Sequence, residues 1–149
     1  MKEKGVTFVE VVISISIFLL AIIPAIEFNR NILETYKKYS IIENGIKNME
    51  ILEKQIRSKG YRKLNEYIGE YNYELLEDSF SINGSGILEG LTLLFLGRKG
   101  EKISVKIEKI NITTSIEEKD LLSLNIEYKT KYKNFKIIRL LSEIEEYYE

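Results

Sequence analysis

Residues 5–26 read GVTFVEVVISISIFLLAIIPAI, and the rest of the chain is organised around this stretch. Between Val6 and Ile26 the only charged side chain is that of Glu10. About 21 residues form roughly 31 Å of α-helix, close to the ~30 Å thickness of the hydrocarbon core of a bilayer. The length predicts a membrane-spanning helix. The carboxylate inside it calls for a functional explanation, because an ionised acid is costly in lipid.

The start of the chain resembles the processing site of type IV prepilins and pseudopilins. In that family a short charged leader ends in Gly, a dedicated peptidase cleaves after it, and the fifth residue of the mature chain is Glu. Residues 1–5 match the leader, Gly5 the cleavage site and Glu10 the Glu. Thr7 also matches, whereas Val6 replaces the usual Phe at the new, methylated N-terminus.

Within that family the similarity is greatest to the minor pilin V and minor pseudopilin I branch, judging from residues 10–12 and Phe18. The resemblance implies a structural subunit, not an enzyme, of a type IV pilus, type II secretion or DNA-uptake (competence) filament. Its implied partners are other pilins, the prepilin peptidase and the inner (cytoplasmic) membrane, and no cofactor. The implied topology is single-pass, with the N-terminus cytoplasmic before cleavage and the C-terminal domain extracytoplasmic, followed by transfer to the filament.

Physical chemistry offers a role for Glu10 in such an assembly. Cleavage after Gly5 would give Val6 a free α-amine with an ordinary pKa of about 7.7–8.0, mostly protonated at neutral pH. An ammonium and a carboxylate, each costly alone in lipid, lower their joint cost by pairing. Glu10 of one subunit is therefore expected to receive the amine of the next, with Thr7 and Phe8 in the same assembly segment.

Two other interpretations of this segment stay open. An ordinary signal-anchor helix could carry Glu10 at the membrane edge without a role. A cleaved secretory signal is disfavoured, because Glu10 interrupts its apolar region and Ile23 occupies a position where a small residue is needed.

Composition limits the remaining chemistry. The 149 residues include 22 basic and 23 acidic side chains, for a formal net charge of −1, so no strongly charged partner is obligatory. The chain has no Cys and no His. Disulfides, Cys or His metal ligands and Ser-His-Asp triads are therefore excluded, and the domain must be held by packing alone.

The helix is predicted to continue beyond the membrane. Apolar residues recur at steps of three and four, at Ile32, Tyr36, Tyr39, Ile42, Ile46, Met49, Leu52 and Ile56. Gly60 suits the position after a helix end, so one helix is predicted from Val6 to Lys59. Pro24 cannot donate a backbone hydrogen bond, and we expect a kink there.

The remainder predicts strands. A short helix is expected over residues 61–68, and a turn at residues 83–86. Strands are predicted at 91–96, 103–107, 122–132 and 135–141, with a bulge before Ile110, a polar turn at 117–120 and a tight turn at Lys133-Asn134.

These elements give an α+β fold, in which a long N-terminal helix packs on a small antiparallel sheet of about four strands. The predicted organisation is a leader at 1–5, a membrane and assembly helix at 6–26, and an extracytoplasmic domain at 27–149 that includes the amphipathic helix half 27–59.

The segment 128–136 interleaves lysines with aromatic residues, a pattern that also occurs in single-stranded nucleic-acid binders. The lysines concerned are Lys129, Lys131, Lys133 and Lys136. In a regular strand, however, Tyr128 and Tyr132 would face the core and the intervening lysines the solvent. Nucleic-acid or surface binding is thus the alternative function, and a plain membrane-anchored domain is a third.

Overall fold

The computed structural model describes residues 7–113 and 118–143. Its first element is a single long helix, α1 (Phe8–Arg57), which continues without interruption through Pro24. The helix begins and ends within two residues of the predicted bounds at Val6 and Lys59. The chain divides into two compact units, one up to Tyr39 and one from Ser40, and α1 contributes to both.

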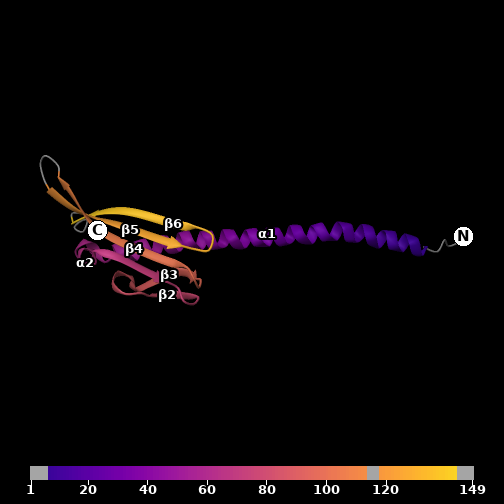
Figure 1. The fold of residues 1–149 in the computed structure, drawn as a ribbon, viewed down its shortest axis with the longest axis horizontal. Helices are drawn as coiled ribbons and strands as arrows, with labels where there is room; N and C mark the ends of the chain where they lie inside the picture. Colours follow the sequence, from indigo (N-terminus) through magenta and orange to yellow (C-terminus); the bar gives the residue numbers. More distant parts are fainter. Residues whose placement is uncertain (1–6, 114–117, 144–149) are drawn as a thin grey trace. The chain divides into compact units, whose positions relative to one another are not determined.

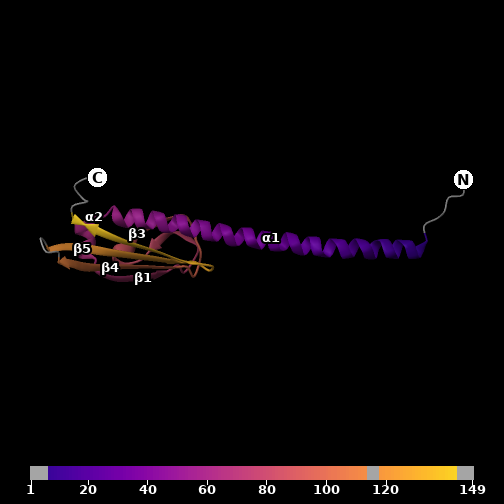
Figure 2. The same cartoon turned by 90° about the horizontal axis from the view of Figure 1, so that it is seen from above.

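The second unit contains a four-stranded antiparallel sheet with the order β1-β4-β5-β6. Its strands are β1 (Gly69–Glu74), β4 (Lys102–Thr113), β5 (Glu118–Lys129) and β6 (Asn134–Ser142). Figure 2 shows the last turns of α1 lying over this sheet. The predicted α+β class, with a long N-terminal helix on an antiparallel sheet of four strands, is confirmed.

A smaller two-stranded sheet joins β2 (Ser79–Asn83) to β3 (Glu89–Gly97), with the 3-10 turn η1 (Gly86–Leu88) between them (Figure 1). The short helix α2 (Gly60–Glu66) follows α1, and Gly60 makes the connection at a φ of 79°. That φ favours glycine, as predicted for the residue after the helix. Neither β1 nor β2 was predicted, because both are short and each has only two apolar side chains.

The core lies between α1 and the inner face of the sheet. Cross-strand pairs such as Ile103 with Tyr128 and Val105 with Ile126 place alternate side chains on this face, as the period of a strand requires. The members from α1, β4 and β5 are Met49, Leu52, Ile56, Ile103, Val105, Ile107, Leu122, Leu124, Ile126 and Tyr128. Burial of each such side chain contributes roughly 1.5–3 kcal/mol.

Three local predictions were wrong. β4 and β5 pair in constant register from Lys102–Lys129 to Thr113–Glu118, so there is no bulge before Ile110. The hydrophobic phase changes there because Lys109 and Ile110 are both exposed, and an exposed strand needs no alternation. β5 already includes Glu118–Asp120, and it ends at Lys129 rather than at residue 132.

The turn after β5 is residues 130–133, not Lys133-Asn134. The backbone N–H and side-chain hydroxyl of Thr130 both donate to the carbonyl of Lys133, at 2.9 Å each, which closes the loop. Tyr132 therefore leaves the strand and is 41% exposed, so its predicted place in the core is also wrong.

The buried face of α1 differs from the predicted stripe. Met49, Leu52 and Ile56 are buried as expected, but Tyr36, Tyr39 and Ile46 are exposed. The buried face instead includes four residues outside that stripe, namely Ile41, Gly45, Asn48 and Glu53. Two of these are polar, so apolar periodicity alone could not find them.

Side-chain amides of α1 complete the hydrogen bonding of β3. Asn48 accepts from the N–H of Phe95 at 2.7 Å and donates to its carbonyl at 3.0 Å. Gln55 likewise accepts from the N–H of Thr92 at 2.9 Å and donates to its carbonyl at 2.8 Å. Seven residues separate the two amides, so both lie on one side of the helix, where they satisfy backbone groups that would otherwise be left unpaired.

Candidate functional site

The N-terminal segment contains most of the predicted site residues. Gly5 and Val6, the predicted processing site, lie outside the described residues. The N–H and hydroxyl of Thr7 donate to Oε2 of Glu10, at 2.8 and 3.0 Å, and the N–H of Glu10 donates to the Thr7 hydroxyl at 3.4 Å. This reciprocal pattern is a capping box at the start of α1.

The sequence signal for this cap is a Thr followed three residues later by Glu, directly before an apolar run. Sequence reasoning noted Thr7 and Glu10 but missed that they bind each other. Within the described residues the cap uses only Oε2 of Glu10, so its other oxygen receives no hydrogen bond there. One carboxylate can thus cap its own helix and accept from a second donor, because its oxygens offer about four lone-pair sites.

The apolar surface of α1 that follows is not covered by the rest of the described chain. Between Thr7 and Ile26 no side chain is buried, and Phe8 is 83% exposed. The two serines in this stretch bind carbonyls of their own helix, from Ser14 to Glu10 and from Ser16 to Val12, at 2.8 Å each. By length and composition this helix can cross a membrane, and it is the one such helix in the described chain.

The four predicted nucleic-acid-binding lysines do not form one group. Lys136 pairs with Glu127 across the β5–β6 ladder at 2.9 Å, which lowers the pKa of that carboxyl. Lys133 lies over the Phe135 ring, 5.8 Å from its centroid. Only Lys129 and Lys131 share a pocket.

That pocket, here called the basic pocket, has a volume of about 430 Å³. The turn between β3 and β4, the loop between β5 and β6, and one residue of α1 line it. Its lining is Ile41, Arg98, Lys99, Gly100, Glu101, Lys102, Lys129, Thr130, Lys131 and Tyr132. Sequence reasoning missed the contribution of residues 98–102, because the two loops are about 30 residues apart and only strand pairing brings them together.

Behind the basic pocket lies a buried polar group. The Tyr128 hydroxyl donates to the Glu101 carboxylate and accepts from the Asn48 amide at 3.3 Å. Glu101 also accepts from the N–H of Arg98 at 3.1 Å. Burial, followed by the hydrogen bond to Glu101, raises the pKa of Tyr128 far above its usual value. These two donors hold the Glu101 carboxylate in a fixed position at the inner side of the pocket.

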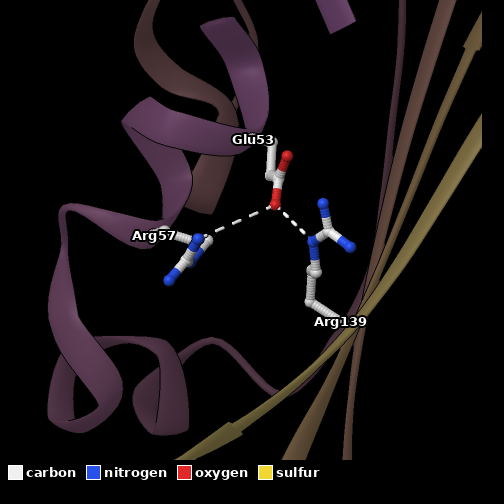
Figure 3. A network of polar contacts seen from close by, with 3 residues as sticks. All are labelled: Glu53, Arg57 and Arg139. Atoms are coloured by element: carbon white, nitrogen blue, oxygen red, sulfur yellow. Dashed lines mark hydrogen bonds and ion pairs between the residues drawn. The ribbon is translucent and has the colours of Figure 1, made fainter. Parts of the chain in front are cut away.

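A second polar network joins α1 to β6 (Figure 3). Glu53, which is 8% exposed, binds Nε of Arg139 at 2.5 Å and lies 3.9 Å from Nη1 of Arg57. The hydrogen bond from Arg139 and the Glu53 charge raise the pKa of that guanidinium. The network neutralises a carboxylate on the buried face of the helix, and we therefore interpret its role as holding α1 against β6.

Within the described residues, no group of three or more acidic side chains lies close enough to hold a metal ion. Two features of the described residues suggest a function, namely the capped apolar helix and the basic pocket. Comparison of the chain with protein-family models, with curated proteins and with solved structures finds no match.

Proposed function

We propose that this protein is a structural subunit, a minor pilin or pseudopilin, of a type IV pilus, type II secretion or DNA-uptake filament. The observation that carries the proposal is the apolar surface of α1 up to Ile26, with one acid, Glu10, in its first turn. In water such a surface would be a severe aggregation liability, so it needs either lipid or other helices of the same kind.

In this proposal the chain is inserted in the cytoplasmic membrane and is cleaved by a prepilin peptidase after Gly5. The unit from Ser40 then faces the extracytoplasmic side. During assembly the helices pack against one another, and the amine of Val6 from one subunit meets Glu10 of its neighbour. The second oxygen of Glu10, which the cap leaves without a hydrogen bond from the described residues, is the natural acceptor.

Processing is the decisive test. The full chain is co-expressed in a bacterial host with and without a prepilin peptidase, and the membrane fraction is analysed by intact mass. We expect the peptidase to remove residues 1–5, and a Gly5→Leu variant to stay uncleaved as the matched control. An unchanged mass in the presence of an active peptidase, checked on a known substrate, would contradict the proposal and favour a plain membrane anchor.

A filament-displayed binding module is the second candidate function, and one observation favours it. Tyr132 is exposed beside Lys131 rather than buried in the core. The alternation of a regular strand, which would place the ring in the core and the lysine in solvent, therefore does not hold at this position. Binding of single-stranded DNA by the purified chain, with an affinity that falls steeply with salt, would support this candidate.

A further inference from the structure

Cations outnumber carboxylates in the lining of the basic pocket. Five cations line it, Arg98, Lys99, Lys102, Lys129 and Lys131, against the single carboxylate of Glu101. Lys102 pairs with Glu74 at 2.9 Å, but the other four make no ion pair within the described residues. Crowded cations repel one another, so an anionic ligand would relieve unfavourable charge as well as bind.

The pocket suits carboxylates on a peptide better than the bases of a nucleic acid. Nζ of Lys131 lies 5.4 Å from the centroid of the Tyr132 ring and so occupies one of its two faces, which leaves a single face for a stacked base. The backbone donors of both turns are used locally, as in the bonds from Arg98 to Glu101 and from Lys99 to Asp78. What remains is a set of flexible cations around the apolar Ile41.

The chain itself contains a segment of complementary chemistry. Residues 143–149 read EIEEYYE, with four glutamates, two tyrosines, one isoleucine and no basic residue. Such a segment could place carboxylates against the lysines and aromatic rings against Ile41 and Tyr132. Surface cations paired with aromatic and acidic side chains are a common interface chemistry.

Most of a copy's own acidic segment cannot reach its own basic pocket. Asn134, beside the pocket loop, pairs with Lys129, while Ser142 pairs with Leu121 at the other end of β6 (Figure 1). Eight residues of strand separate them by roughly 27 Å. Glu143 lies 3.8 Å from Arg62 of α2, at the end away from the pocket. The fully extended segment spans at most about 25 Å, so only its last residue could approach the pocket of its own copy, and the glutamates at 143, 145 and 146 fall short of it.

We propose that the basic pocket binds the acidic segment 143–149 of a second copy of this chain. Because the pocket and Glu143, at which the segment begins, are at opposite ends of the same sheet, the contact is head to tail, and it propagates instead of closing into a symmetric pair. This inference goes beyond the proposed function, since it concerns the unit from Ser40 and needs neither cleavage after Gly5 nor Glu10.

The test is peptide binding by the full chain in detergent micelles. A fluorescent peptide of residues 142–149 is titrated with the protein, and anisotropy is measured at low and high salt. We expect saturable binding that weakens as salt rises, because screening reduces attraction between exposed charges. The double variant Lys99→Glu, Lys131→Glu should weaken binding at least about tenfold.

The control is Lys133→Glu, which reverses a nearby lysine outside the pocket lining and should change the affinity by less than about twofold. A peptide with all glutamates changed to Gln should not bind the wild-type protein. This result does not depend on how well the protein variants fold. A peptide carrying Lys at positions 145 and 146 should bind the double variant better than it binds the wild type.

Three outcomes would overturn the inference: no binding of the wild-type peptide, equal binding of the Gln peptide, or equal loss in the Lys133→Glu control. Tighter binding of a single-stranded oligonucleotide that displaces the peptide would assign the pocket to nucleic acid instead. None of these results depends on processing, so failure here leaves the proposed function standing.

Discussion

At the scale of single residues, Glu10 has two roles that a substitution can separate. Its carboxylate caps α1 through Thr7, and in the proposed assembly it also accepts a neighbour's amine. Gln can replace Glu in a capping box, since its side-chain oxygen also accepts from a backbone N–H. It cannot neutralise an ammonium group. The two roles therefore respond differently to the loss of charge.

We predict that Glu10→Gln leaves the helix capped but reduces incorporation into filaments by roughly tenfold or more, because an amine without its counter-charge is costly in lipid. Glu10→Ala should be at least as severe. The measurement is the amount of subunit in sheared filaments relative to the membrane fraction. Glu27→Gln is the control, an exposed acid on the same helix. Equal incorporation of Glu10→Gln and wild type would leave the cap as the sole role.

Tyr128 places a polar hydroxyl group in the core. Its ring is fully buried, and its hydroxyl bonds both Glu101 and Asn48. We predict that Tyr128→Phe lowers the free energy of unfolding by about 1–3 kcal/mol, because Glu101 loses a donor in a buried site. Tyr132→Phe, at an exposed ring, should change it by less than about 0.5 kcal/mol. Urea unfolding measures both.

The pH dependence follows from the same residue. The folded pKa of Tyr128 lies above its unfolded value of about 10, so the folded protein holds a proton that the unfolded chain releases. The stabilisation is thus complete below pH 10 and is lost as the pH rises above it. We expect wild-type stability to fall above about pH 10 more steeply than that of Tyr128→Phe. Parallel pH profiles would refute this role.

At the scale of elements, the approach of α1 to the sheet depends on a helix position without a side chain. A Cβ at Gly45 would lie 2.6 Å from Cε2 of Phe135 and 3.0 Å from Cγ2 of Thr130. The first distance is too short for a real contact. Gly45 therefore sets how closely the helix packs on β6 and on the pocket loop.

Gly45→Ala brings two opposed effects. The helix gains about 1 kcal/mol of intrinsic propensity, whereas overpacking costs about 1–3 kcal/mol. We predict a net loss of stability for Gly45→Ala and a larger loss for Gly45→Val, measured by thermal unfolding. Adding Phe135→Leu should recover part of the loss, because it removes the clashing ring. A stabilised Gly45→Ala would mean that the ring moves aside freely.

At the scale of the whole molecule, the chain combines one unit suited to lipid with one suited to water. The core cluster draws its α1 residues from Met49 onward, and none of residues 7–39 belongs to it. The sheet unit should therefore hold together without the membrane helix, in keeping with its own buried core.

We predict that a chain beginning at Tyr36, one helical turn before Ser40, is folded and soluble without detergent. Its free energy of unfolding should lie within about 0.5 kcal/mol of that of the sheet unit in the full chain, because distant parts contribute independently. Hydrogen exchange of the β4 and β5 amides is the common measurement. A shortened chain that is unfolded or aggregated would show that the first unit is required for the fold.

The apolar stretch near the N-terminus, the extent of α1 and the α+β class were all predictable from the amino-acid sequence. These follow from length and from apolar period, which are local properties of the chain. Strands β3 to β6 were also predictable, because each has a continuous or alternating apolar run. β1 and β2 were not, since each has only two apolar side chains, and an alternation that short does not identify a strand.

Only the tertiary structure decided which face of α1 is buried and where the lysines meet. Asn48 and Glu53 are buried because Phe95, Tyr128 and Arg139 supply their partners, and no pattern within the helix reveals partners that distant. Lys129 and Lys131 join residues 98–102 for the same reason. Strand pairing brings turns that are distant in the sequence to one end of the sheet. Their basic side chains then line one pocket, although they are about 30 residues apart in the sequence.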